Sequence, residues 1–221
     1  MLLINPDNPS GNFIPLDEIC KLADWCKAKC IRLIVDESFV DFSEQWEFSS
    51  LLSNHYLETY PKMVVVKSIS KSYGVPGLRL GILASADTEL IAKMKKQVSI
   101  WNINSFAEFF MQIYTKYEKD YRHACSEFLA VRTEFLNKLR CVSFLYVLPT
   151  QANFVLCEVL SPFTANEIAR DLLKDYDILV SVCGAKKGIA ANKYIRLAIR
   201  NAEDNNRLIE ALRELDITRR V

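Results

Sequence analysis

The sequence predicts an α/β fold in which a mostly parallel sheet with helices is followed by a smaller α+β module. Up to about residue 86, short β-branched apolar runs alternate with amphipathic helical segments, which is the pattern of a parallel sheet covered on both faces. After about residue 141, four strand-like runs and two helical runs lie close together. We therefore expect two domains, residues 1–120 and 121–221, that meet in a long helical stretch.

The elements of the first domain follow from local patterns. Residues 1–4, 31–36 and 62–70 are apolar runs that we expect to form parallel strands, and residues 81–85 are a fourth strand. Residues 15–30 predict a helix, because Pro15 suits a first helical position and Asp17 and Glu18 favour the positive end of the helix dipole. Active-site residues collect at the carboxyl ends of such strands.

The second domain has its own pattern. Residues 87–140 are helical apart from a break at 101–105, and strands are expected within 142–149, 152–159, 177–182 and 194–200, with helices at about 166–176 and 202–215. The run "GAKKG" at residues 184–188 lacks the spacing of a phosphate-binding P-loop, so we interpret it as a basic turn.

Composition excludes several classes of partner. The chain has 221 residues, half of them apolar, and its 28 basic and 27 acidic side chains give a net charge of +1 without long runs of either sign. We expect no nucleic-acid or membrane partner, because no apolar run approaches the ~20 residues of a spanning helix. With no signal peptide, a cytoplasmic protein is expected. The seven cysteines are interpreted as reduced thiols, and no metal site is expected.

Lys71 is the strongest candidate for covalent chemistry. It follows the third strand within "SISKSYGVPGLRLG", residues 68–81, and a partly desolvated lysine among positive neighbours is suited to form a Schiff base. On position alone it could be a surface lysine. Ser68, Ser70 and Arg79 are donors able to hold a phosphate, and a phosphate beside a Schiff-base lysine indicates pyridoxal 5′-phosphate (PLP). Asp36 would then pair with the pyridinium nitrogen, or it is a helix cap or an exposed turn residue.

Four motifs in this order resemble the fold-type I PLP enzymes, in the class I/II aminotransferase group near histidinol-phosphate aminotransferases and threonine-phosphate decarboxylases. They are "NPDNPSG" at 5–11, "VDESF" at 35–39, the Lys71 motif and "YIRLAIR" at 194–200. The resemblance spans nearly the whole chain. It implies a homodimer in which each active site receives residues from the partner chain.

The resemblance also implies a role for each matching residue. Lys71 corresponds to the lysine that binds PLP covalently, Asp36 to the partner of its ring nitrogen and Asn8 to the donor to its phenolic oxygen. Ser68, Ser70 and Arg79 resemble the phosphate-binding residues. Arg196 corresponds to the arginine that binds the substrate carboxylate, with a surface ion pair as the alternative.

Two departures from the family pattern bear on function. Phe39 stands where the family usually has a tyrosine that donates to the same phenolic oxygen, so we expect a higher Schiff-base pKa. The family also has roughly 100 to 150 residues before the asparagine motif, which supply a helix start that binds phosphate. We therefore expect a truncated chain, and weak or absent PLP binding if this is the entire chain.

These features lead to three hypotheses. The first is a PLP-dependent aminotransferase, similar to histidinol-phosphate aminotransferases, that moves an amino group from an amino acid, amino phosphate or amino phosphonate to a 2-oxo acid. The second is a decarboxylase of the threonine-phosphate type, favoured by "WNINSFAE" and by Arg200, which replaces the glycine usual in histidinol-phosphate aminotransferases. Arg200 is either an anchor for a substrate phosphate or a surface charge. The third is a non-catalytic fragment.

Overall fold

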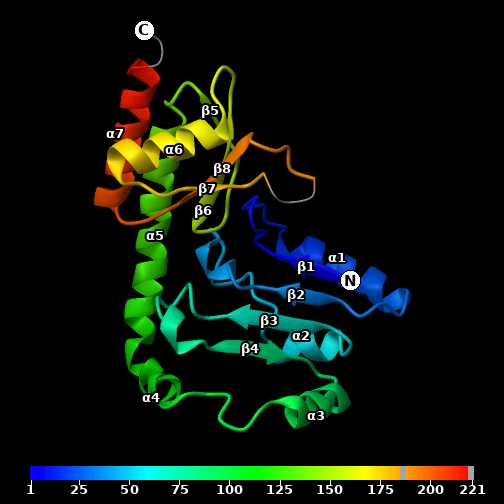
Figure 1. Ribbon diagram of the computed structural model, residues 1–221. Helices are drawn as coiled ribbons and strands as arrows, with labels where there is room; N and C mark the ends of the chain where they lie inside the picture. The colour runs from blue at the N-terminus through cyan, green and yellow to red at the C-terminus, as the bar shows by residue number, and fades with distance from the viewer. Residues whose placement is uncertain (185–187, 219–221) are drawn as a thin grey trace. The chain divides into compact units, whose positions relative to one another are not determined.

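The computed structural model describes residues 1–184 and 188–218, which form two compact units (Figure 1). The first unit contains residues 1–7 and 13–126, and the second contains residues 8–12 and those from Glu127 onward. The division between the units therefore falls inside the longest helix, α5 (Glu118–Leu139). Residues 185–187 of the predicted basic turn lie outside the described residues.

The first unit is built on a four-stranded sheet whose strands lie one below the next in Figure 1. Its first three strands are parallel and the fourth is antiparallel to the third, as their hydrogen-bonded registers show. In sheet order the strands are β1 (Leu2–Ile4), β2 (Ile34–Asp36), β3 (Val64–Ser68) and β4 (Gly81–Ala84). The carboxyl ends of β1, β2 and β3 thus meet at one edge, as the sequence predicts.

Helix α1 (Leu16–Ala28) begins after Pro15 and buries an apolar face of Ile19, Ala23 and Cys26 against the sheet core. Asp17 and Glu18 occupy its first turn, where negative charge is favourable. The remaining helical segments of the unit are α2 (Asn54–Thr59), α3 (Thr88–Gln97) and α4 (Ser105–Ile113), with 3₁₀ turns η1 (Val40–Phe42), η2 (Pro76–Leu78) and η3 (Tyr114–Tyr117).

The second unit contains an antiparallel sheet in the order β5 (Leu145–Val147), β6 (Phe154–Val159), β8 (Tyr194–Ala198), β7 (Ser181–Val182). Helix α6 (Ala165–Tyr176) contacts β7, β8 and α7 (Ala202–Thr218). Thr164 and Glu167 form a capping box that satisfies backbone donors at the start of α6. The α/β class and the strand pattern predicted from the sequence are confirmed.

Within the described residues, every helix is too short or too polar to span a membrane.

Candidate active site

The Lys71 loop leaves the carboxyl end of β3 as a tight turn. Backbone N–H groups of Tyr73, Gly74 and Val75 donate to the carbonyls of Ile69, Lys71 and Ser70 at 3.1 to 3.2 Å, and Gly74 takes φ +64°. A positive φ favours glycine, because it has no Cβ. The turn leaves the Lys71 side chain exposed, with its Nζ 4.7 Å from the centre of the Phe39 ring. The amine is therefore accessible to a ligand, and the apolar ring of Phe39 lies beside it.

Asp36 ends β2, the strand beside β3. Its carboxyl group is partly buried, and Oδ1 accepts a hydrogen bond of 2.9 Å from the backbone N–H of Ser38. That bond stabilises the turn after β2, so the turn role and the proposed pyridinium role are compatible. The next residue, Glu37, is buried and accepts hydrogen bonds of 2.7 Å from the Ser50 hydroxyl and the Leu51 N–H. Burial raises the pKa of Glu37, and the two donors partly oppose that rise.

The predicted phosphate-binding residues differ in exposure. Ser68 ends β3 partly exposed, and its N–H donates to the Ser38 hydroxyl at 3.0 Å. Ser70 is buried, with its hydroxyl 3.5 Å from the Leu80 carbonyl. Arg79 is exposed in a left-handed conformation at φ +56°, and its Nη1 donates to the Pro76 carbonyl at 3.2 Å. Arg79 and Ser68 thus present donors to solvent, whereas Ser70 would have to exchange a partner to bind a phosphate.

In the second unit, the structure brings Asn8 and Arg196 together although 188 positions separate them. Arg196 Nη1 donates to Asn8 Oδ1 at 2.7 Å, and the guanidinium lies 5.2 Å from the centre of the Phe154 ring. Arg196 lines an open hollow of about 340 Å³ together with Leu179, Val180, Ser181 and Ala198. The guanidinium is thus held by an amide and an aromatic ring beside a space that could receive a carboxylate.

Gly11 belongs to the same segment as Asn8. It takes φ +72°, and a Cβ added there would lie 2.1 Å from Oγ1 of Thr150. Its carbonyl accepts a hydrogen bond of 2.9 Å from the Gln151 N–H. Close approach of two backbones thus requires glycine at this position.

Arg200 lies just beyond β8 and is mostly exposed, its side chain retaining 69% of its accessibility. Its Nε donates to Asp204 at 2.7 Å. Arg200 lines a hollow of about 280 Å³, which shares Leu179, Val180 and Ala198 with the Arg196 hollow. Two arginines, Arg200 and Arg207, and two aspartates, Asp177 and Asp204, line it. The structure therefore contains the surface ion pair of one interpretation, and Arg200 also borders a hollow that the other interpretation requires.

Sequence reasoning missed a buried ion pair near Lys71. Lys67 Nζ lies 2.6 Å from Asp41 Oδ1, and each side chain is only 8% exposed. The available signal was a charged residue inside each of two apolar runs, "VVVKS" and "FVDF". Neither run indicates a partner for its charge, because Lys67 lies in β3 and Asp41 in η1, and only the folded structure brings the two into contact.

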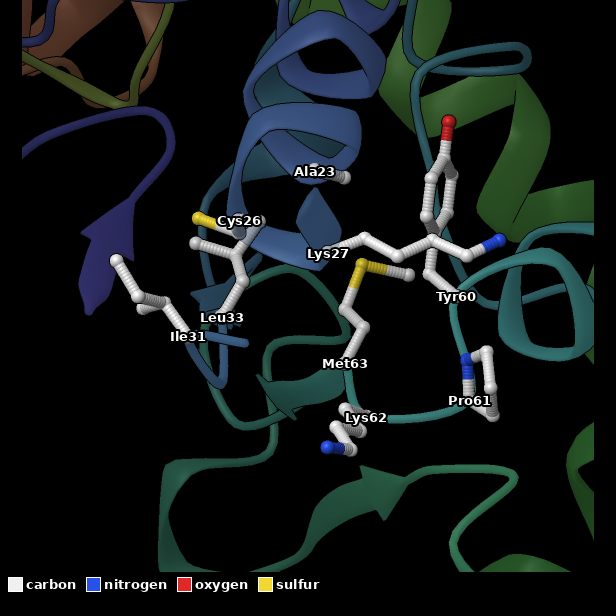
Figure 2. A pocket seen from close by; sticks show the side chains of 9 residues that line it. All are labelled: Ala23, Cys26, Lys27, Ile31, Leu33, Tyr60, Pro61, Lys62 and Met63. Atoms are coloured by element: carbon white, nitrogen blue, oxygen red, sulfur yellow. The ribbon is translucent and has the colours of Figure 1, made fainter. Parts of the chain in front are cut away.

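The first unit also has an apolar pocket of about 260 Å³ at the opposite, amino end of its strands (Figure 2). Ile31 and Leu33 precede β2 and Met63 precedes β3; in Figure 2 the Met63 side chain extends toward Ala23, whereas the Lys62 amine points away from the other lining side chains. Its other lining residues are Cys26, Lys27, Tyr60 and Pro61. None of the predicted site residues lines it, so this pocket is not the candidate active site.

Comparison with known proteins identifies the family. Residues 1–212 match the family described as aminotransferase class I and II. The chain belongs to this family. Its enzymes depend on PLP, as the sequence predicts.

Three relatives are similar to this chain over nearly its whole length. It is 33% identical over 218 residues to L-serine phosphate decarboxylase of Sulfurospirillum multivorans, covering 97% of this chain and 55% of that protein. A solved decarboxylase from Sulfurospirillum multivorans is 32% identical with a TM-score of 0.87, covering 97% of this chain and 60% of that one. The histidinol-phosphate aminotransferase of Clostridium acetobutylicum is 26% identical with a TM-score of 0.87, covering 98% and 64%.

The residues of the first unit fit one part of a PLP site. An accessible amine and a partly buried carboxylate follow neighbouring parallel strands, with serine and arginine donors on the same loop as the amine. The amine suits the aldehyde of PLP, the carboxylate suits its pyridine nitrogen, and the serine and arginine donors suit its phosphate. The chain spans little more than half the length of the decarboxylase relative.

Proposed function

We propose that this chain is the later part of a PLP-dependent decarboxylase that acts on a phosphorylated amino acid. The observation that carries the proposal is its similarity to L-serine phosphate decarboxylase over 97% of the chain, at 33% identity. The solved decarboxylase of the same organism supports it with a TM-score of 0.87. The sequence predicts an aminotransferase first and a decarboxylase as the alternative, and these relatives favour the decarboxylase.

In this proposal, residues of the first unit hold the cofactor. Lys71 binds the PLP aldehyde carbon through its amine, Asp36 keeps a proton on the pyridine nitrogen, and Ser68 and Arg79 donate to the phosphate. PLP, when bound, accepts the electron pair left on the substrate Cα when carbon dioxide departs. The Lys71 amine, freed when the amino group of the substrate takes its place, would give a proton to Cα as a general acid.

Residues of the second unit select the substrate. Arg196 binds a carboxylate or phosphate through charge-assisted hydrogen bonds, and Asn8, which accepts from Arg196 at 2.7 Å, orients it and donates to the cofactor's phenolic oxygen. Arg200 and Arg207 line a neighbouring hollow together with Asp177 and Asp204, and Arg200 would bind a second anionic group there in exchange for its bond with Asp204. The whole protein is proposed to act as a cytoplasmic homodimer on a small amino-phosphate substrate.

Carbon dioxide release tests the proposal. The purified protein, supplied with PLP and no 2-oxo acid, is expected to release carbon dioxide from O-phospho-L-serine or O-phospho-L-threonine. Lys71→Ala should reduce the rate by at least about 10²-fold, because it removes a general acid. Lys96→Ala is the matched control, since Lys96 is an exposed lysine of α3. Carbon dioxide release at equal rates from Lys71→Ala and the unaltered chain would refute the role of Lys71.

Arg200 provides a substrate-level test. Arg200→Ala should raise KM for the phosphorylated substrate at least several-fold while leaving kcat nearly unchanged, because an arginine that only binds a remote phosphate contributes uniform binding. An unchanged KM would assign Arg200 to its surface pair with Asp204 alone.

The second candidate is an aminotransferase, supported by the 26% identity and 0.87 TM-score with the histidinol-phosphate aminotransferase. It predicts amino transfer from histidinol phosphate to 2-oxoglutarate, without carbon dioxide release. A protein that takes up PLP at Lys71 but performs neither reaction would instead support the non-catalytic fragment.

A further inference from the structure

The buried pair of Lys67 and Asp41 joins the two segments that carry the candidate catalytic groups. Lys67 is the fourth residue of β3 and precedes Lys71 by four positions, and Asp41 lies in η1, five positions after Asp36. Removing both charges from water opposes folding by several kcal/mol per ion, so a buried ion pair is weak evidence for stability by itself. The retention of two charges here therefore calls for another explanation.

The contacts around the pair define what it holds. The Glu37 N–H donates to the Val66 carbonyl at 2.8 Å, and the Ser68 N–H donates to the Ser38 hydroxyl at 3.0 Å. The Phe39 ring lies 4.7 Å from Lys71 Nζ. Together with the 2.6 Å ion pair, these contacts bind the segment after Asp36 to the segment before Lys71. The ion pair is the only one of the four that joins two ionised side chains.

The other side of the Lys71 loop is held by Tyr73. Its ring stacks on Tyr121 of α5 with centres 4.2 Å apart and planes 6° from parallel, and its hydroxyl lies 3.3 Å from that of Tyr114. Burial raises the pKa of both Tyr73 and Tyr121, and the charge of Asp41 raises them further. The Tyr73–Tyr121 stack therefore anchors the side of the loop that the ion pair does not contact.

In the same region, Asp41 Oδ2 is buried and has no hydrogen-bond partner among the described residues. Buried polar atoms without partners weaken a structure unless other contacts determine the geometry strongly. The Lys67–Asp41 pair is the strongest directional contact available here to do so.

We propose that Lys67 and Asp41 are positioning residues that fix the Lys71 loop against the turn after Asp36. A hydrogen-bonded ion pair favours one relative orientation of its two side chains, whereas two apolar side chains of similar volume can pack in several orientations. The inference rests on the proposed function for its catalytic meaning, because it concerns the spacing between the amine and the carboxylate that would hold PLP.

Amide hydrogen exchange tests this without a cofactor. In the double variant Lys67→Met with Asp41→Leu, the melting temperature should stay within a few degrees, because apolar replacement of a buried pair is often tolerated. The amides of Ser68, Gly74 and Val75, whose hydrogen bonds hold the loop, should exchange at least about tenfold faster. The amide of Ala23 in α1 should keep its rate, and Lys67→Arg, which retains the charge, should keep all four rates.

An unchanged exchange rate at all three loop amides in the double variant would overturn the proposal. Equal acceleration at Ala23 would also overturn it, since the pair would then act only on global stability. If the double variant does not fold, Lys67→Gln with Asp41→Asn replaces it, because that pair keeps a hydrogen bond without charge, and the same two outcomes decide. If the loop amides of the double variant exchange faster but the unaltered protein releases no carbon dioxide, the proposed function is refuted and the positioning role remains.

Discussion

The two ends of the first unit's sheet differ in what they offer a ligand. The amino end has an apolar pocket of about 260 Å³, and none of the predicted site residues lines it. The carboxyl end has an exposed amine, a partly buried carboxylate and a buried ion pair within two adjacent turns. This apolar pocket and the candidate site residues therefore lie at opposite ends of the sheet, because the polar groups gather where parallel strands end.

The largest expected difference between the two ends is the change in the free energy of unfolding when a buried or an exposed lysine is replaced. Lys67→Met alone should lower the free energy of unfolding by about 3–5 kcal/mol, because it leaves the Asp41 carboxylate buried without its partner. Lys62→Met, at the rim of the amino-end pocket, should change it by less than about 0.5 kcal/mol, as Lys62 is exposed. Denaturant unfolding measures both, and similar values for the two variants would contradict the assigned difference in burial.

A smaller effect is expected in the loop that follows the carboxyl end of β1. Gly11→Ala should destabilise the protein by about 1–3 kcal/mol, because its Cβ would overlap the Thr150 side chain and its φ is +72°. Gly77→Ala is the control, since a Cβ there meets no atom within 4 Å and its φ is not positive. The same thermal or denaturant unfolding assay applies, and a neutral Gly11→Ala would show that this loop adopts another conformation in solution.

The buried carboxyl group beside Asp36 should make stability depend on pH. Burial raises the folded-state pKa of Glu37 above its unfolded value near 4.3. The folded state then favours the protonated form, so the free energy of unfolding relative to Glu37→Gln should fall as pH rises from about 4 through the folded pKa. Above that pKa the difference should be constant. A difference that instead increased with pH over this interval would mean that the two hydrogen-bond donors outweigh burial.

The smallest effect is expected at the amino end. Tyr60 donates a long hydrogen bond of 3.4 Å to the Cys20 carbonyl, so Tyr60→Phe should lower stability by about 0.5–1 kcal/mol near neutral pH. Burial raises the pKa of Tyr60 to about 12. Relative to the variant, the unaltered protein should lose stability as pH rises above about 10, the unfolded value. A pH-independent difference up to pH 11 would indicate an unperturbed hydroxyl.

Much of the fold follows from local sequence patterns. The apolar periodicity of α1, with Ile19, Ala23 and Cys26 buried, and the continuous runs that become β2 and β3 are visible because each reports burial within a few residues. The six-residue helix α2 was not predicted, since so short a segment shows hardly two turns of periodicity. Candidate residues at strand ends, Lys71 and Asp36, were identified by the same local reasoning.

Sequence alone determined which residues could do chemistry, because residue type and position after a strand are local properties. Only the tertiary structure decided what those residues contact. The bond between Asn8 and Arg196 spans 188 positions, and the pair of Lys67 in β3 and Asp41 in η1 spans 26. Side chains that alternate along a strand have a known face but no known partner until a second strand is placed beside them. Only the tertiary structure shows that Lys67 and Asp41 form a contact, and that this contact joins the Lys71 loop to the turn after Asp36.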